Sequence, residues 1–348
     1  MLGLRPDSHV LTFGEIMMRL SPPDHYRLEQ ATSFDVNYGG AEANVALSLA
    51  FQGGSSSFVS VVPPTRIGDI ALRSLRAYGV DVSRVVRAGE RLGSYFFEIG
   101  ASQRGNAAVY DRKYSAISMA PRDSFDWGAI LEGVDAFYVS GVTPALSDET
   151  AAATLDGLRA ARDRGVTTIL DLNYRGKLWT PEHAQQVMRG LMPFVDVCVA
   201  NDEDAPSALG MTCVSGSLEN GIEERDDYVE MAREICSEYG CSAVASVVRD
   251  VRTVEDSQWM GMLYLADSGE HWFSPVHDVH VLEGVASGDA FSAALIHAME
   301  HGMDPQDAID YAIAGSVLKL SIRGDLNLVS EAEIRAAMGT ASGSRVSR

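Results

Sequence analysis

Residues 135–172 read DAFYVSGVTPALSDETAAATLDGLRAARDRGVTTILDL, and the order of patterns within them decides the fold. DAFYVSG and TTILDL have the composition of short strands, whereas DETAAATLDGLRAARDRG between them has that of a helix. The same alternation recurs where VLTFGEIMM precedes AEANVALSLAFQ, where FVSVV precedes IGDIALRSLRAYG, and where VDVCVA precedes a helix after Asn201. Repeated strand–helix–strand units predict an α/β fold with a parallel sheet, whose ligands bind where the carboxyl ends of the strands meet.

Two hairpins interrupt this alternation. Residues 93–112 contain two consecutive strands, GSYFFEIG and NAAVYDR, joined by ASQRGN with no helix between them, which predicts a small β flap. WMGMLYLA and HWFSP, joined by DSGE, form the second hairpin and are expected at an antiparallel edge of the main sheet. The polar tail GTASGSRVSR, residues 339–348, is predicted to be disordered.

Composition limits the class of protein. The 348 residues are 46% hydrophobic, contain no apolar run long enough for a membrane span and begin without the features of a signal peptide, so a soluble cytoplasmic protein is expected. The four cysteines show no metal-binding spacing, which indicates buried thiols in a reducing compartment. A formal charge of −20 repels phosphate-rich surfaces, so neither nucleic acid nor an anionic membrane is an expected partner. An anionic small substrate would need local arginines.

The stretch EGVASGDAF, residues 283–291, places one carboxylate between small residues and an apolar helix pattern that begins at about Asp289. Ala286, Ser287 and Gly288 can present consecutive backbone N–H groups to an anion, supported by the helix dipole. Asp289 would then face that anion as the base of a phosphoryl-transfer site. On this motif alone, the simpler alternative is that Asp289 caps the helix.

Two further loops carry polar residues at positions suited to a ligand. Gly39 and Gly40 precede a helix pattern, and paired glycines let a ligand approach the backbone closely, with Asn44 one turn further on. In DLNYRGKLWTP, a strand ends just before Asn173 and Arg175, which places both on the ligand-bearing edge of the sheet. The alternatives are a tight turn for the glycines and an ordinary solvated loop for the arginine.

The flap can present a polar face to a ligand. Tyr110 and Arg112 lie two residues apart in VYDR and so share one face of a strand, and Tyr95 lies on the partner strand. The planar fork of an arginine suits a carboxylate or a phosphate. The alternative is that these side chains simply cover the sheet.

Two other patterns concern metals and nucleotides. HAMEH, residues 297–301, matches the H-x-x-E-H pattern of inverted zincins, but Gly302 follows at once, so both histidines sit in a last helical turn that the helix dipole favours without a metal. Lysine occurs only at Lys113, Lys177 and Lys319, and none stands in a Walker or protein-kinase motif. Any nucleotide chemistry must therefore use arginine, backbone amides and helix ends.

In this order, the motifs resemble the PfkB, or ribokinase-like, carbohydrate kinases over nearly the whole chain, from about Val10 to Met338. Within that family, the resemblance is strongest to 2-keto-3-deoxygluconate kinases, which have runs similar to GGAEANVA, GASQR, VYDR, SGVTPALS, DLNYRGKLW, LMPFVDV and GDLNLVS. The resemblance implies a ribokinase-like three-layer α/β sandwich with a mostly parallel central sheet. It implies one kinase domain over residues 1–338, with a β lid from about 17–38 and 92–115 that commonly forms the contact of a homodimer.

The reaction that the resemblance implies is transfer of the γ-phosphoryl group of ATP, with Mg²⁺, to the 6-hydroxyl of 2-keto-3-deoxygluconate. Asp289 matches the catalytic base of the family, and its anion hole is matched by Ala286, Ser287 and Gly288, the last also facing the nucleotide. The residues expected to bind the sugar acid are Gly39, Gly40, Asn44, Tyr95, Tyr110, Arg112, Asn173 and Arg175. On the nucleotide side, the expected residues are Asn201 and Asp204, which match a motif that organises magnesium indirectly, and Arg249.

The sequence departs from the family pattern around the anion hole. Glu283 replaces an aspartate and Ala286 replaces the first glycine, and a Cβ at position 286 restricts the backbone if this residue needs a positive φ. Two alternative functions therefore stay open. One is a PfkB kinase for another hexose such as fructose, for which Arg112 and Arg175 would have no carboxylate to bind. The other is a catalytically impaired sugar- or nucleotide-binding paralogue.

Overall fold

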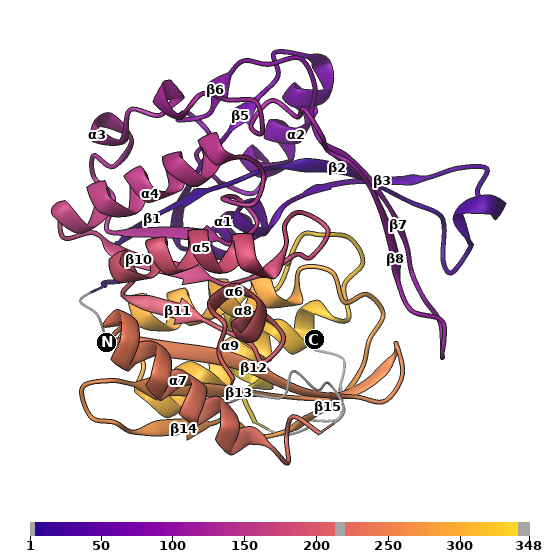
Figure 1. Ribbon diagram of the computed structural model, residues 1–348. Helices are drawn as coiled ribbons and strands as arrows, with labels where there is room; N and C mark the ends of the chain where they lie inside the picture. Colours follow the sequence, from indigo (N-terminus) through magenta and orange to yellow (C-terminus); the bar gives the residue numbers. More distant parts are fainter. Residues whose placement is uncertain (1–3, 213–219, 340–348) are drawn as a thin grey trace.

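The computed structural model describes residues 4–212 and 220–339, and at its centre lies a sheet that is parallel through most of its width (Figure 1). In spatial order its strands are β14 (His271–Phe273), β13 (Asp256–Leu265), β12 (Ala243–Val251), β11 (Val197–Val199), β10 (Thr167–Asp171), β9 (Ala136–Ser140), β1 (His9–Phe13) and β4 (Ser55–Val59), with β15 (His277–His280) also paired to β13. The strands from β12 to β4 pair in parallel, whereas β13 pairs antiparallel with β12, β14 and β15. Both the parallel sheet and its antiparallel edge are thus confirmed.

Helices cover both faces of this sheet. The core on one face includes residues of α3 (Trp127–Ile130), α4 (Asp148–Asp163), α5 (Pro181–Leu191), α6 (Asp204–Leu209) and α7 (Arg225–Tyr239), and the core on the other includes residues of α1 (Ala41–Phe51), α8 (Ser287–Glu300) and α9 (Pro305–Lys319). α2 (Arg66–Arg76) packs with α1, and α10 (Glu331–Ala337) packs with α8 and α9. Alternate side chains of a strand serve the two layers, so that Leu11 and Phe13 face one core and Val10 the other.

A second, smaller sheet forms the lid. Its order is β3 (Asp35–Gly39), β2 (Met17–Ser21), β7 (Ser94–Glu98) and β8 (Ala107–Asp111), with β2 and β7 parallel and the other pairs antiparallel. Figure 1 shows these strands extending away from the body on one side. A short pair, β5 (Val61–Val62) with β6 (Val86–Arg87), completes the strands among the described residues. The predicted three-layer sandwich with a β lid is confirmed.

The first predicted strand is wrong in one respect. The composition of VLTFGEIMM predicted one run, but it divides between β1 in the central sheet and β2 in the lid, which begins at Met17 as the resemblance implied. Gly14 lies at the crossing, where a Cβ would stand 2.1 Å from Glu42 Oε2, so the chain leaves the sheet at a position that only glycine fills without displacing a buried side chain. The contact comes from another element and leaves no pattern in the strand itself.

Other expectations from the sequence concern the cysteines, membrane spans and the bounds of the domain. Cys198, Cys236 and Cys241 are buried free thiols, as predicted, and Cys213 lies outside the described residues. Among the described residues, no helix has both the length and the apolar character that a membrane span requires. The assignment of residues 1–338 to one kinase domain stays a prediction, and 340–348 of the predicted disordered tail lie outside the described residues.

Candidate active site

A cavity of about 820 Å³ lies between the lid and the carboxyl ends of the central strands. Its wall comes from β7 and β8 of the lid, from the loops after β10 and β11, and from the first turn of α8. Of the predicted site residues, the wall contains Gly40, Asn44, Tyr95, Tyr110, Arg112, Asn173, Arg175, Asn201, Asp204, Arg249, Ala286, Ser287, Gly288 and Asp289. Gly39 is the one predicted site residue outside the wall.

Asp289 lies in the first turn of α8, which begins at Ser287, two residues before the predicted start at about residue 289. The N-cap is Ala286 and no side chain caps the helix, so the capping alternative for Asp289 is wrong. Instead, Asn44 Nδ2 donates a hydrogen bond of 2.7 Å to Asp289 Oδ2. Burial raises the pKa of Asp289 to about 6, although the Asn44 hydrogen bond opposes this shift. The carboxylate is therefore suited to accept a proton near neutral pH.

Ala286 has the left-handed backbone conformation, with φ 64° and ψ 13°. Ala286 therefore has the positive φ that the sequence analysis identified as unfavourable for an alanine. A glycine at this position would adopt the same φ without strain. The N–H groups of the first helical turn have no partner within a helix, and in α8 they belong to the residues that follow Ala286 in the cavity wall. This turn presents the positive end of the helix dipole to the cavity, which suits a phosphate.

Gly39 and Gly40 are needed for close packing of the backbone. A Cβ at Gly40 would lie 1.9 Å from Glu15 O, and a Cβ at Gly39 would lie 2.4 Å from Asp325 Cβ. Gly40 is the N-cap of α1, and its N–H donates to Asn44 Oδ1 at 3.4 Å. The two glycines therefore allow α1 to begin close to the lid, in the position from which Asn44 reaches α8.

The loops after β10 and β11 bring a second group of carboxylates to the cavity. Asp204 accepts hydrogen bonds from Tyr174 N at 2.8 Å and from Asn201 Nδ2 at 3.2 Å, one on each oxygen. Burial raises the pKa of Asp204 and of Asp171, and the charges of Asp204 and Asp289 raise that of Asp171 further. Sequence reasoning missed Asp171, although an acidic residue ending a buried strand at the ligand edge was a usable signal. Carboxylate and amide oxygens such as those of Asp204 and Asn201 are ligands of the kind that suit a magnesium ion, directly or through water.

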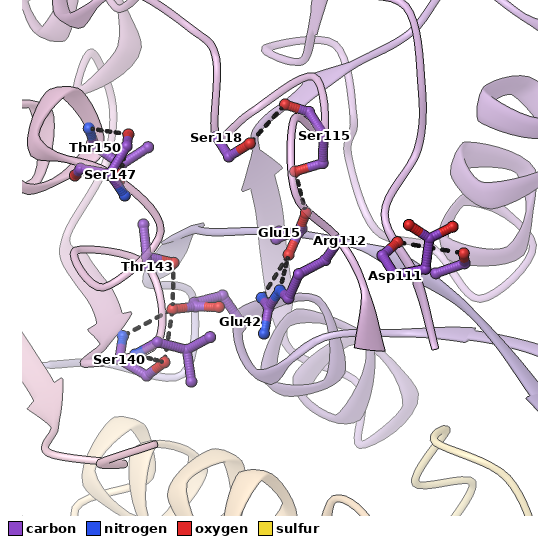
Figure 2. Close-up of polar contacts among 12 residues, drawn as sticks. Glu15, Glu42, Asp111, Arg112, Ser115, Ser118, Ser140, Thr143, Ser147 and Thr150 are labelled. Carbon is purple, nitrogen blue, oxygen red and sulfur yellow. Dashed lines mark hydrogen bonds and ion pairs between the residues drawn. The ribbon is translucent and has the colours of Figure 1, made fainter. Parts of the chain in front are cut away.

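Arg112 lines the cavity, but its charge is already paired. Its Nε donates to Glu15 Oε2 at 2.9 Å, its Nη2 donates to the same oxygen, and Ser115 Oγ donates to Glu15 Oε1 (Figure 2). Arg175 differs, because its Nη1 donates to the backbone oxygen of Tyr174 at 2.9 Å and no carboxylate of the described residues lies within ion-pair distance. Burial raises the pKa of Asp171, Asp204 and Asp289, and the charge of Arg175 opposes this rise from a distance. Because it forms no ion pair with them, Arg175 is still the wall arginine whose charge is most available to a ligand.

The lid contributes aromatic rings to the wall. Tyr95 and Tyr110 are cross-strand partners, as predicted, and their rings stack with centroids 5.3 Å apart. Lys177 Nζ lies 5.7 Å from the centroid of the Tyr110 ring and donates to Ala108 O at 2.8 Å. Sequence reasoning considered this lysine only when excluding nucleotide motifs, but its place in the loop of Arg175 was a usable signal.

A buried ion-pair network joins the lid to the loop before α8. Arg19 of β2 pairs with Glu283, and its Nε lies 3.0 Å from Asp325 Oδ2, with all three side chains at most 2% exposed. Gly324 N donates to Glu283 Oε2 at 3.1 Å, and Tyr95 Oη donates to Asp325 Oδ1 at 3.0 Å. Glu283, the departure noted in the sequence, is thus tied to the base of the lid, and Asp325 is a wall residue that sequence reasoning missed.

Comparison with known proteins gives consistent matches. The model of the pfkB family of carbohydrate kinases matches residues 7–331. The crystal structure of a 2-dehydro-3-deoxygluconokinase from Thermotoga maritima is 42% identical, with a TM-score of 0.91, and covers 96% of this chain and 99% of its own. A 2-dehydro-3-deoxygalactonokinase of Haloferax volcanii is 32% identical over 327 residues, 94% of this chain and 95% of its own. A fructokinase from Xylella fastidiosa, solved with bound ATP, shares the fold at 19% identity, with a TM-score of 0.73 and coverage of 95% and 98%.

These matches are consistent with the sequence, with the fold and with the cavity. The family model and both 2-dehydro-3-deoxy-sugar kinases extend over nearly the whole chain. The central sheet with its β lid agrees with the fold of the solved structures. The cavity contains a buried carboxylate, Asp289, in the first turn of a helix, an arrangement compatible with phosphoryl transfer to a hydroxyl. The chain belongs to the pfkB family of carbohydrate kinases.

Proposed function

We propose that this kinase transfers the γ-phosphoryl group of ATP to the 6-hydroxyl of 2-keto-3-deoxygluconate, which is the same compound as 2-dehydro-3-deoxygluconate. The observation that carries the proposal is that one cavity wall holds both a buried carboxylate, Asp289, and an arginine without a carboxylate partner among the described residues, Arg175. A sugar acid offers a hydroxyl to the first and a carboxylate to the second. A neutral hexose such as fructose would leave Arg175 unpaired.

Asp289 acts as the general base in this proposal. Asn44 Nδ2 holds one carboxylate oxygen, and the other can accept the proton of the 6-hydroxyl while the hydroxyl oxygen attacks the γ-phosphorus. The N–H groups of residues 287 and 288 and the helix dipole would offset charge on the transferred group. Phosphoryl transfer depends mainly on such positioning and charge stabilisation.

The carboxylate of the substrate would be held by cations that the wall already contains. Arg175 is the principal candidate, with Lys177 beside the lid, and Arg112 would contribute less because Glu15 compensates its charge. Local cations are needed because the net charge of −20 repels an anionic substrate. Tyr95 and Tyr110 would cover the sugar from the lid side.

ATP is expected on the side of the wall formed after β11 and β12. Arg249 pairs there with Glu203, and its guanidinium lies 5.7 Å from the centroid of the Trp259 ring. Asn201 and Asp204 would hold Mg²⁺ directly or through water, since both offer oxygen ligands. The ion, when bound, supplies positive charge beside the β- and γ-phosphates.

Assembly and location are part of the proposal. Val36 and Val109 on the lid strands are 52% and 54% exposed, and apolar side chains on a projecting sheet support a homodimer through the lid. The proposed location is the cytoplasm, in keeping with buried thiols that form no disulfide among the described residues.

A second candidate substrate is 2-keto-3-deoxygalactonate. The Haloferax volcanii relative, a 2-dehydro-3-deoxygalactonokinase at 32% identity, favours it. The two compounds share the carboxylate, the keto group and the 6-hydroxyl and differ in configuration at one carbon. The argument from Arg175 applies equally to both.

The proposal is tested by measuring ADP release with both keto acids and with fructose, using Asp289→Asn as the blank. We expect turnover of the acids and a rise in KM for them of about 10- to 100-fold in Arg175→Ala, since a charged hydrogen bond contributes about 1.5–3 kcal/mol. Arg233→Ala, which removes an exposed arginine of α7, is the matched control and should leave KM unchanged. Turnover of fructose equal to or better than that of the acids would exclude the proposed substrate.

A further inference from the structure

The C-terminal end of α8 carries a second cluster of polar side chains. His297, Glu300 and His301 offer ligand atoms that all lie within 4.8 Å of one another. The three residues lie 8 to 12 positions after Asp289, so this cluster is about 12–18 Å along the helix axis from the catalytic end. None of the three residues lines the cavity. The cluster therefore belongs to a different place in the molecule from the candidate active site.

Two of these side chains are buried without hydrogen-bond partners among the described residues. His297 is 1% exposed and Glu300 is 2% exposed, and neither ring nitrogen of the first nor either oxygen of the second has such a bond. The nearest acidic group to His297 is Glu331, whose Oε2 lies 3.8 Å from Nε2, beyond hydrogen-bond distance. Each unsatisfied buried polar group costs about 1–3 kcal/mol. A cation bound among them would offset this cost.

The hydrogen bonding of His301 leaves one of its ring nitrogens free to bind an ion. His301 Nδ1 lies 2.9 Å from His297 O, and because a carbonyl only accepts, Nδ1 carries the proton and Nε2 keeps its lone pair. Ligating histidines commonly donate their other N–H to a backbone carbonyl in this way. The His297 ring stacks on that of His301, with centroids 4.0 Å apart and planes 28° apart, and on that of Tyr311, with centroids 5.4 Å apart. Because the lone pairs of an imidazole lie in its ring plane, the two histidine rings must turn before both can bind one ion.

We propose that His297, Glu300 and His301 bind a divalent transition-metal ion of the Zn²⁺ type, with water or Glu331 as the fourth ligand. Imidazole nitrogens with one carboxylate suit such an ion, and residues at i, i+3 and i+4 share one face of a helix. Tetrahedral coordination needs ligand atoms about 3.3 Å apart and converging ring planes, so binding requires rotation of both histidine side chains. Because two of the ligands are buried, the ion would be structural, joining α8 to α10 if Glu331 completes the site.

The test uses the full-length protein after removal of metals with a chelator. We expect one Zn²⁺ to bind per chain with a Kd in the micromolar range or below, raising the melting temperature. Co²⁺ in its place should show the visible absorption of a four-coordinate ion without a thiolate charge-transfer band. His301→Ala and Glu300→Gln should each weaken Zn²⁺ binding at least about tenfold.

His280→Ala is the matched control, because this histidine is exposed and lies on β15, outside the cluster. It should bind Zn²⁺ as the wild type does. Equal Zn²⁺ affinity in wild type, His301→Ala and Glu300→Gln would overturn the proposal, as would a cobalt–thiolate band, which would assign the ion to cysteines. Failure of the wild-type protein to bind Zn²⁺ at micromolar concentrations would overturn it too. The Co²⁺ spectrum needs no variant, so the proposal stays testable if a substitution prevents folding.

Discussion

Asp289 is held by a partner from another helix and not by the helix that it begins. We expect Asp289→Asn to lower kcat by about 10²- to 10⁴-fold, the usual contribution of a general base. The free energy of unfolding should change by less than about 1 kcal/mol, because Asp289 caps nothing and asparagine keeps the shape. ADP release and urea unfolding measure the two effects. Asp304→Ala is the control, since it removes the true N-cap of α9 and should cost about 1 kcal/mol with full activity. A large loss of stability with full activity in Asp289→Asn would instead show that Asp289 caps α8.

The protonation of Asp289 should appear in the pH dependence of turnover. Burial raises the pKa of this carboxyl to about 6, and only its deprotonated form can accept the substrate proton. We expect kcat/KM to rise with pH through about 6 and to level off above 7. Asn44→Ala removes a hydrogen bond that lowers this pKa, so its profile should move to higher pH. Identical profiles for the two proteins would show that another group controls the rate.

The backbone of Ala286 is strained, because its φ of 64° lies in the left-handed region. We expect Ala286→Gly to raise the free energy of unfolding by up to about 1 kcal/mol, because glycine reaches this conformation without strain, although it also gains freedom in the unfolded chain. Ala151→Gly, in the regular part of α4, is the control and should lower it by about 1 kcal/mol. Urea unfolding measures both. A destabilised Ala286→Gly would mean that the Cβ makes packing contacts that outweigh the strain.

At the scale of elements, the lid is joined to the loop before α8 by Arg19. We expect Arg19→Met to lower the free energy of unfolding by up to about 3–5 kcal/mol, because Glu283 and Asp325 would stay buried without their ion-pair partner, with only the more distant charge of Lys319 to offset theirs. Urea unfolding at pH 7 measures this loss.

The control is the triple variant in which Glu283→Gln and Asp325→Asn accompany Arg19→Met. Because all three charges are then removed, we expect this variant to be more stable than Arg19→Met alone. If the triple variant were the less stable of the two, the network would hold the lid through hydrogen bonds and not through its charges.

At the scale of the whole molecule, an acidic chain also buries acidic groups. Glu42 joins α1 to the end of β9, because its Oε1 accepts from Ser140 N at 2.9 Å and from Thr143 Oγ1 at 2.8 Å (Figure 2). Burial raises its pKa from 4.5 to about 7, with the Ser140 and Thr143 hydrogen bonds opposing the shift. A carboxyl group with a raised folded-state pKa stabilises the protein fully below its unfolded pKa. That stability is lost as the pH rises through the folded value.

We therefore expect the protein to lose about 3 kcal/mol of stability, relative to Glu42→Gln, between pH 4.5 and pH 7.5. Urea unfolding of both proteins across this range measures the difference. Glu29→Gln, which removes an exposed carboxylate near the tip of the lid, should keep the pH dependence of the wild type. A Glu42→Gln profile parallel to that of the wild type would show that Glu42 is ionised throughout.

Much of the fold could be predicted because its signals are local. DAFYVSG and the helix after it differ in period over a few residues, and α5 begins with two local start signals, Thr180 at the N-cap and Pro181 at the first position. The local pattern of VLTFGEIMM does not show where it divides, because the division involves close packing of Glu42 against Gly14; only the family resemblance placed the start of the lid near residue 17. In the site, the pairing of Arg112 could not be predicted from local sequence either, because its partner Glu15 lies 97 residues away in the chain.

The sequence by itself determined the alternation of strands and helices, the net charge, and which chemical groups follow the carboxyl ends of the strands. Only the tertiary structure decided which of those groups are free to act. It pairs Arg112 with Glu15 and leaves Arg175 without a carboxylate partner among the described residues. It also raises the pKa of Asp289 by burial beside Asn44. The physical reason is that periodicity and turn chemistry act between near neighbours in the chain, whereas ion pairing and desolvation depend on residues that only folding brings together.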